Sequence, residues 1–386
     1  MTSTRTDHCV PAPGTGRLSL PLVRRIRTAY RAAIAGYSER QSDLWSYIAT
    51  RTRDIHEALI GEDDDRVTDL LSDPGSNNLF YGFDNLNIET TQAFSRSGDG
   101  APAWAADGAP AWAAQLVVMI AQLAESVAAK RIWQPEFGTT YPYYEQTQSR
   151  DMESLLCAIE QKIGCGLAFP TPFPNEYGVA TSRGIVSHRA IHAIYYASRL
   201  SMLRPRGRGC SILEIGAGMG RTALYAHEWG LGQYTIVDLP MSNVAQAAFL
   251  GAVLGEDAIC LTGENRSGIR ILTPTWLFAT DGRFDIMLNT DSLTEMPLET
   301  ATRYAQIAMD RAGKLLSVNH EANDVLVHEL APLRGRSLYR SPYWVRPEYV
   351  EELFVADASG HERGGRRFWN RIRSRISSSL SRLLAA

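Results

Sequence analysis

A glycine-rich turn between an apolar run and a helical pattern has the clearest chemical content in this chain. The apolar run ends at Ile215, and glycines follow at every second position, at Gly216, Gly218 and Gly220. Glycines have no Cβ, so a ligand can lie directly on the backbone of such a turn. The acidic Glu214 stands two residues before the first glycine. We therefore predict a strand, a turn and a helix that together bind a ligand.

The residue after the last glycine narrows the class of ligand. A dinucleotide fingerprint has its third glycine or alanine where this chain has Arg221. The order acid-x-Gly-x-Gly-x-Gly instead resembles the first motif of the class I S-adenosylmethionine (SAM) methyltransferases. The resemblance implies SAM as cofactor, held by Glu214, Gly216, Gly218 and Gly220.

Acidic residues also follow the next two predicted strands. Asp238 ends one of them, where a carboxylate can accept hydrogen bonds from ribose hydroxyls, and Leu239 comes next in the same site. The alternative is that Asp238 caps the helix that opens at Pro240. Glu264 follows the other strand, where it either contacts the adenine amino group or is a solvated loop acid.

Two further strand ends carry groups suited to the reaction itself. Asn289, Asp291 and Glu295 follow one predicted strand, and His320 follows the next. We assign Asn289 to the cofactor site. Methyl transfer to a hydroxyl needs a general base, and we expect His320 or Asp291, alone or as a dyad, with Glu295 beside them. A metal held by Asp291, Glu295 and His320 is the alternative, but the sequence has no compact acid–acid spacing, so we predict no metal.

Several short motifs between about Gly178 and Phe354 resemble the bacterial sugar O-methyltransferases, a branch of the class I SAM-dependent enzymes. These motifs are Thr181-Ser-Arg-Gly184, Ser187-His-Arg189, Glu214-Ile-Gly-Ala-Gly218, Val237-Asp-Leu-Pro240, Asn289-Thr-Asp-Ser-Leu-Thr-Glu-Met296, Asn319-His-Glu321 and Tyr343-Trp-Val-Arg346. The resemblance implies a SAM-dependent O-methyltransferase that acts on a hydroxyl of a sugar or glycoside by in-line displacement.

Two alternative functions stay open. The Asp-Leu-Pro motif also resembles O-methyltransferases of phenols, whose catalytic histidine follows the fourth strand, where this chain has Asp291. A phenolic or polyketide acceptor is therefore the second interpretation, and a SAM- or nucleotide-binding protein without turnover is the third. Arg189 could close over the SAM carboxylate. Trp45 and Phe83 could stack on a sugar ring or belong to the core.

An open parallel sheet would place all these strand ends at one edge. From Gly209 apolar runs alternate with helical patterns, which predicts an α/β fold with a doubly wound, mostly parallel, Rossmann-like sheet over 206–356. A mainly helical acceptor-side domain over 18–205 precedes it, after a flexible leader over 1–17. The expected strands are Ser211–Ile215, Tyr234–Asp238, Ala258–Thr262, Phe284–Asn289 and Lys314–Asn319.

The helical part contains one segment with the character of a loop. Residues 72–110 are loop-like and include an eight-residue unit, 99–106, that is repeated without change as 107–114. We interpret the repeat as a tolerated duplication in a surface loop. A buried helix is expected over 111–132, and Leu44 is expected on the apolar stripe of an earlier helix.

Composition and charge restrict the partners and the compartment. The net charge of −3 gives no reason to expect nucleic acid as a partner, and the five cysteines form no CxxC pair, as in reduced intracellular proteins. We therefore expect a cytoplasmic protein. The tail over 357–386 is basic, and the amphipathic stripe over 366–384 could contact a membrane surface, the protein's own surface or a second copy in a homodimer.

Overall fold

The computed structural model describes residues 9–37, 42–95, 108–132 and 151–356. Its centre is an eight-stranded sheet with the order β10-β11-β9-β8-β4-β5-β7-β6. The strands are β4 (Ser211–Ile215), β5 (Gln233–Val237), β6 (Ile259–Leu261), β7 (Ile269–Leu272), β8 (Ile286–Thr290), β9 (Lys314–His320), β10 (Ser337–Pro342) and β11 (Tyr349–Val355). Across the sheet from β9 to β6, each pair of neighbouring strands is parallel, whereas β11 is antiparallel to both of its neighbours. The predicted fold class is confirmed.

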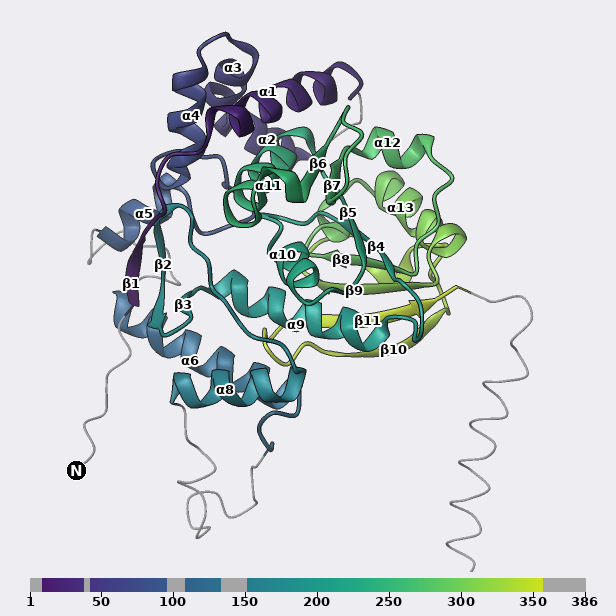
Figure 1. The fold of residues 1–386 in the computed structure, drawn as a ribbon. Coiled ribbons are helices and arrows are strands. Elements are labelled where there is room, and N and C mark those ends of the chain that lie inside the picture. Colours follow the sequence, from purple (N-terminus) through teal and green to yellow (C-terminus); the bar gives the residue numbers. More distant parts are fainter. Residues whose placement is uncertain (1–8, 38–41, 96–107, 133–150, 357–386) are drawn as a thin grey trace, which may run out of the picture.

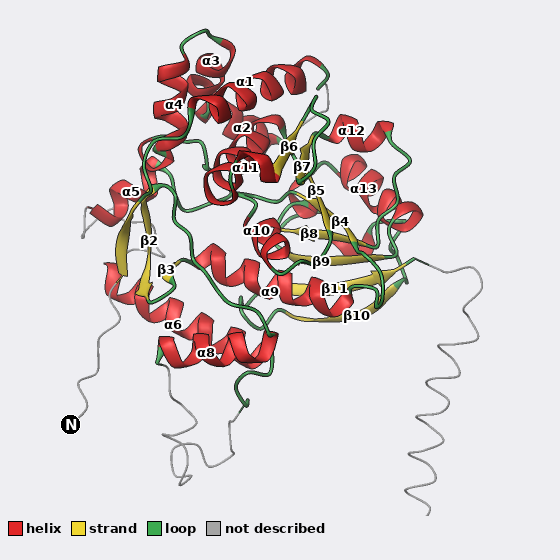
Figure 2. Cartoon of the chain, in the orientation of Figure 1, coloured by secondary structure: helices red, strands yellow, loops and turns green. Residues whose placement is uncertain are grey.

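The sheet is buried on both faces, as a parallel sheet requires. Adjacent residues of β4 point to opposite sides, so that Ile212 belongs to one hydrophobic cluster and Leu213 to the other. Figures 1 and 2 show the helices on these faces. They are α9 (His188–Leu203), α10 (Arg221–Glu228), α11 (Pro240–Leu254), α12 (Pro274–Ala279) and α13 (Leu298–Arg311).

The order of the strands reverses at β4. This strand pairs with β5 on one side and with β8 on the other, and later strands extend the sheet in both directions. In open α/β sheets a crevice forms outside the carboxyl ends of the strands at such a reversal, and ligands bind there. The glycine turn follows β4, so it lies at this point.

The N-terminal segment is mainly helical; in Figure 1 its first helices lie beside α11 and the β6 edge, whereas its last helices lie beside α9. Ser19 caps α1 by accepting a hydrogen bond from the backbone N–H of Leu22, and the buried face of α1 packs on α11. The helices are α1 (Leu20–Ala35), α2 (Asp43–Arg51), α3 (Arg53–Ile60), α4 (Asp64–Ser72), α5 (Ile88–Ser95), α6 (Gly108–Ser126) and α8 (Met152–Ile163). A small antiparallel sheet joins β1 (Cys9–Pro13), β2 (Pro174–Thr181) and β3 (Gly184–Val186).

Several local expectations are wrong. The predicted flexible leader contains β1, because its backbone pairs with β2. The predicted loop over 72–110 contains a short 3-10 helix, η1 (Pro74–Ser76), and α5. The second copy of the repeat belongs to α6, where Trp112 is buried, and Leu44 is 47% exposed rather than on a buried stripe. Strands β7, β10 and β11 were not expected.

Two features of the sequence lie outside the described residues. They are the basic tail over 357–386 and the first copy of the repeat, over 99–106. Among the helices of the described ranges, none combines the length and apolar character needed to span a bilayer.

Candidate functional site

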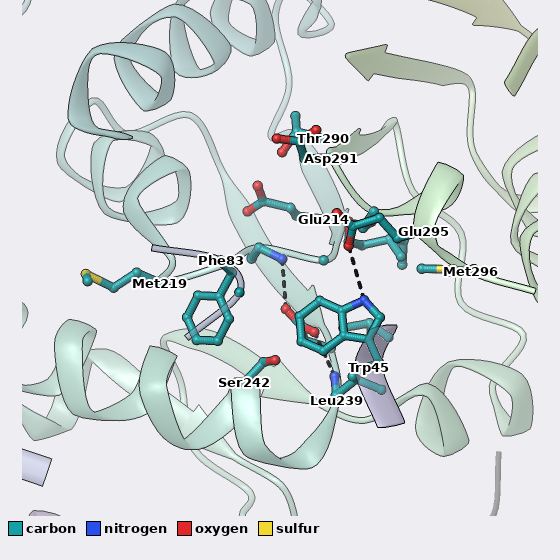
Figure 3. A pocket seen from close by; sticks show the side chains of 18 of the residues that line it. Trp45, Phe83, Glu214, Met219, Leu239, Ser242, Thr290, Asp291, Glu295 and Met296 are labelled. Atoms are coloured by element: carbon teal, nitrogen blue, oxygen red, sulfur yellow. Dashed lines mark hydrogen bonds between the residues drawn. The ribbon is translucent and has the colours of Figure 1, made fainter. Parts of the chain in front are cut away.

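A pocket opens at the carboxyl ends of β4, β5 and β8, where the strand order reverses (Figure 3). Helix α9 and the first residues of α13 line it from the α/β part of the chain, and α2 and the loop around Phe83 line it from the N-terminal part. Among the lining residues are Trp45, Phe83, Arg189, Glu214, Gly216, Gly218, Met219, Asp238, Leu239, Asp291, Glu295 and Met296.

The glycine turn needs glycine for its backbone angles, and two of its positions also need it for their surroundings. Gly216, Gly218 and Gly220 all have positive φ angles, of 72°, 55° and 92°, in the left-handed region that favours glycine. A Cβ on Gly216 would lie 2.3 Å from Ser292 Oγ, so this glycine allows close packing. A Cβ on Gly218 would meet nothing nearer than Phe83 O at 3.8 Å, so the backbone here faces open pocket space. The turn expected from the sequence is present.

Asp238 fastens the turn to the neighbouring strand. Its carboxylate accepts hydrogen bonds from the backbone N–H groups of Ala217 at 2.9 Å and Leu239 at 2.8 Å, and from Gln246 Nε2 at 2.7 Å. Burial raises the pKa of Asp238 to about 6. The N-cap position of α11 belongs to Leu239, so Asp238 is not the simple helix cap of the alternative interpretation.

Glu214 lies at the bottom of the same pocket. Only 1% of its surface is exposed, and Oε2 accepts a hydrogen bond from Tyr234 Oη at 2.8 Å. Burial raises the pKa of Glu214 to about 8, so the carboxyl group is mostly protonated at neutral pH. A buried acid that lines a pocket is poised to respond to a cationic ligand.

Three residues assigned to the cofactor from the sequence, Gly220, Glu264 and Asn289, do not line the pocket. Both carboxylate oxygens of Glu264 lie 2.8 Å from nitrogens of Arg25, on α1. Asn289 is fully buried, and its amide nitrogen donates to Ile215 O at 3.0 Å while its oxygen accepts from Asn319 Nδ2 at 2.9 Å. Asn289 thus joins neighbouring strands beneath the pocket.

Asp291 lines the pocket but its charge is already compensated. Its Oδ2 lies 2.8 Å from Arg346 Nη1, 3.1 Å from Tyr349 Oη and 3.5 Å from Arg189 Nη1. Its φ of 55° is uncommon for a residue other than glycine, and aspartate tolerates it better than most residues do. The two ion pairs, with Arg346 and Arg189, make Asp291 a counter-ion within the structure.

His320 is not among the residues that line the pocket. Its Nδ1 accepts a hydrogen bond from the backbone N–H of Ala322 at 3.2 Å, and its ring packs edge-on against Tyr349 with the centroids 5.5 Å apart. The structure records no hydrogen bond between His320 and Asp291 in its described ranges; Tyr349 contacts both residues instead. The expected dyad is therefore not formed, and the ligand set of the metal alternative does not converge.

Glu295 has the properties expected of a proton acceptor. It ends the short 3-10 helix η4 (Leu293–Glu295) at the pocket wall. Burial, and next the charge of Asp291, raise the pKa of Glu295 to about 7. Its Oε2 accepts a hydrogen bond from Trp45 Nε1 at 3.1 Å. A carboxyl group with a pKa near neutrality matches what a general base requires.

A buried histidine pair lies on α9, where His192 lines the pocket and His188 does not. His192 Nδ1 is 2.8 Å from Tyr343 Oη, and His188 stacks on Trp112 with the centroids 5.5 Å apart. Burial holds the pKa of both histidines well below the ordinary value, so both rings are neutral. In the described part of the chain, no group of histidine, cysteine, aspartate or glutamate residues is arranged to hold a metal ion.

The pocket walls from the N-terminal part were the hardest to predict. The sequence leaves two interpretations open for Trp45 and Phe83, a surface that stacks on a ring or part of the core, because no motif marks them. The hydrogen bond from Trp45 to Glu295 spans 250 positions of sequence, and no local pattern encodes such a contact. The strand-end acids, in contrast, could be found because parallel strands end at one edge.

Neither a protein-family model nor a curated protein matches the sequence. Among solved structures, magnesium protoporphyrin IX methyltransferase from Synechocystis PCC 6803, with bound SAM, is 15% identical over 45% of this chain and 86% of that chain, with a TM-score of 0.29. A protein from Pyrococcus horikoshii OT3 is 10% identical over 42% and 92%, with a TM-score of 0.33. A protein from Thermoplasma acidophilum is 13% identical over 44% and 86%, with a TM-score of 0.30. Since these TM-scores are below 0.5, the fold class rests on the strand order and pairing within this chain.

Proposed function

We propose that this protein is a SAM-dependent O-methyltransferase whose acceptor is a hydroxyl of a sugar or glycoside. The observation that carries the proposal is the open backbone of Gly218 beside Glu214 and Asp238, in a pocket at the reversal of the strand order. This arrangement suits an adenosine derivative that lies along the turn, with its ribose toward Asp238. We assign the carboxylate of SAM to Arg189, which lines the pocket from α9 and has further donors besides the Nη1 that contacts Asp291.

Transfer of the methyl group then requires alignment and removal of one proton. SAM supplies a methyl group that its sulfonium already activates, so the protein has to place the acceptor oxygen in line with the methyl carbon and the sulfur. Glu295 takes the hydroxyl proton as the new C–O bond forms and the C–S bond breaks. We assign the base to Glu295 because Asp291 is paired with two arginines and His320 does not line the pocket.

The walls of the pocket support a small acceptor. Trp45 gives an aromatic surface next to the carboxylate of Glu295, a combination that suits the ring face and the hydroxyls of a sugar. A phenolic or polyketide acceptor is the second candidate, favoured by the apolar side chains of Phe83, Met219 and Met296 in the same lining. With either acceptor, the helical part over 18–205 would form much of the acceptor side of the pocket.

Two measurements test the proposal. Calorimetry with the full chain should show binding of SAM and S-adenosylhomocysteine and no binding of NAD. Turnover measured with radiolabelled SAM on matched panels of glycosides and phenols should then show which acceptor class is methylated. Binding of NAD in place of SAM would contradict the cofactor, and methylation of phenols alone would favour the second candidate. Binding of SAM without turnover on either panel would favour a protein that binds SAM but does not catalyse.

A further inference from the structure

From the contact between Trp45 and Glu295, we infer that Trp45 is a positioning residue that fixes which oxygen of Glu295 carries the proton. The indole Nε1–H of Trp45 points at Glu295 Oε2, 3.1 Å away, and Figure 3 shows the two side chains next to each other, joined by a dashed line. An indole N–H can only donate a hydrogen bond. Oε2 must therefore remain an acceptor whether Glu295 is ionised or protonated, and a proton on Glu295 has to reside on Oε1.

The other oxygen of Glu295 is the one left to the pocket. Within the described residues, no hydrogen bond to Oε1 is recorded, and the residue lines the cavity. In the proposed reaction a base must present one defined oxygen to the acceptor hydroxyl. Trp45 determines which oxygen this is, because rotation of the carboxyl group would place the acidic Oε1–H against the indole N–H, which is also a donor.

Helix α2 is held in place by Ile48 and Arg51, two residues that do not line the pocket. Ile48, one turn after Trp45, is 5% exposed and occupies the space above Gly82, where a Cβ would lie 2.5 Å from Ile48 Cδ1. The Arg51 guanidinium lies 4.9 Å from the ring centroid of Tyr81. Helix α2, which carries Trp45, is thus anchored on the loop that also carries Phe83. The N-terminal part would in this way set the orientation of a base that belongs to the α/β part.

The first test follows the protonation of Glu295 in the free protein, without any substrate. The chain has eight tryptophans, and the indole N–H signal of Trp45 in a 15N-labelled sample is identified by its loss in Trp45→Phe. We expect this signal to shift with pH with a midpoint near 7, and to lose the shift in Glu295→Gln. Trp344 is the matched control, because its indole donates to Glu125 at 3.0 Å outside the pocket; its signal should not follow this midpoint. A Trp45 signal that does not titrate, or that titrates equally in Glu295→Gln, would overturn the inference.

The second test rests on the proposed function and measures kcat against pH. The bond from Trp45 favours the charged form of Glu295, so Trp45→Phe, which keeps a ring but removes the donor, should raise the pKa of Glu295. We expect the acid limb of the profile to move up by about one pH unit, which lowers kcat about tenfold at pH 6 and much less at pH 9. Trp344→Phe should leave the profile unchanged. An acid limb that stays in place in Trp45→Phe would overturn the positioning role. Failure to find any methyl transfer would contradict the proposed function but leave the first test decisive.

Discussion

Arg346 Nη1 lies 2.8 Å from Asp291 Oδ2, so the residue that follows β8 is tied to the turn between β10 and β11. The same carboxylate accepts from Tyr349 Oη at 3.1 Å. Asp291 therefore holds the antiparallel edge of the sheet against the pocket. Its role in the structure is that of a counter-ion and clamp, and this distinguishes it from Glu295 on the same loop.

Removal of this clamp should destabilise the protein. In Asp291→Ala the partly buried Arg346 loses its partner, and alanine must adopt a φ of 55°. We expect the free energy of unfolding to fall by about 2–3 kcal/mol in urea titrations. Asp291→Asn, which tolerates this φ better, should lose about 1 kcal/mol. The exposed pair of Asp257 and Arg266 is the control, since Asp257→Ala should change the stability by less than about 0.5 kcal/mol. Equal stability of Asp291→Ala and the wild type would refute the clamp.

The assignment of the base predicts a separation between Glu295 and His320. Glu295→Gln should lower kcat by roughly 10²–10⁴-fold with little change in SAM affinity, because the carboxyl group acts on the acceptor. His320→Ala should retain a near-normal rate, since His320 does not line the pocket. The wild-type kcat should rise with pH through about 7, as Glu295 loses its proton. Steady-state kinetics of both variants measure these changes in kcat. A greater loss of kcat in His320→Ala than in Glu295→Gln would indicate that the general base is His320.

The glycine turn can be tested with a pair of matched glycines. Gly218→Ala introduces a methyl group into open pocket space at a φ of 55°, so it should weaken SAM binding at least tenfold by calorimetry. Gly207 has a φ of 77° and nothing within 4 Å of an added Cβ, but it does not line the pocket. Gly207→Ala should therefore carry a similar backbone strain of about 1 kcal/mol and bind SAM normally. Unchanged SAM affinity in a folded Gly218→Ala variant would argue against the cofactor site.

The sequence predicted the parallel sheet and the glycine turn because both are encoded locally. Buried parallel strands form continuous apolar runs, and positive φ angles require glycine, so β4 and its turn were evident. Edge strands such as β10 have little apolar signal, since most of its residues are exposed, and it was missed. The contacts of Glu264 and His320 could not be predicted for another reason. A strand end fixes the edge at which a residue lies, but the partners of its side chain come from distant segments, such as Arg25 for Glu264.

A last prediction concerns the proton that Glu214 carries in the protein without SAM. Burial raises its pKa to about 8, so at pH 7 the carboxyl group is mostly protonated. SAM brings a positive sulfonium, which favours the ionised form of a nearby carboxyl group. Binding of SAM to the wild type at pH 7 should therefore release a substantial fraction of a proton. Calorimetry in buffers of different ionisation enthalpy measures this release. In Glu214→Gln the release should be smaller by the fraction of a proton that Glu214 supplies in the wild type.

The raised pKa of Glu214 also makes the stability of the protein without SAM depend on pH. Because the folded pKa of Glu214 exceeds its value in the unfolded chain, folding favours the protonated form, and its contribution to stability is lost as pH rises through about 8. Glu214→Gln cannot ionise, so its stability relative to the wild type should be more favourable at pH 9 than at pH 6 in urea unfolding. SAM should reduce this difference, since it binds the ionised form of the wild type. A proton release that is equal in the wild type and Glu214→Gln, together with a stability difference that does not vary with pH, would show that Glu214 is not the group that responds to the cofactor.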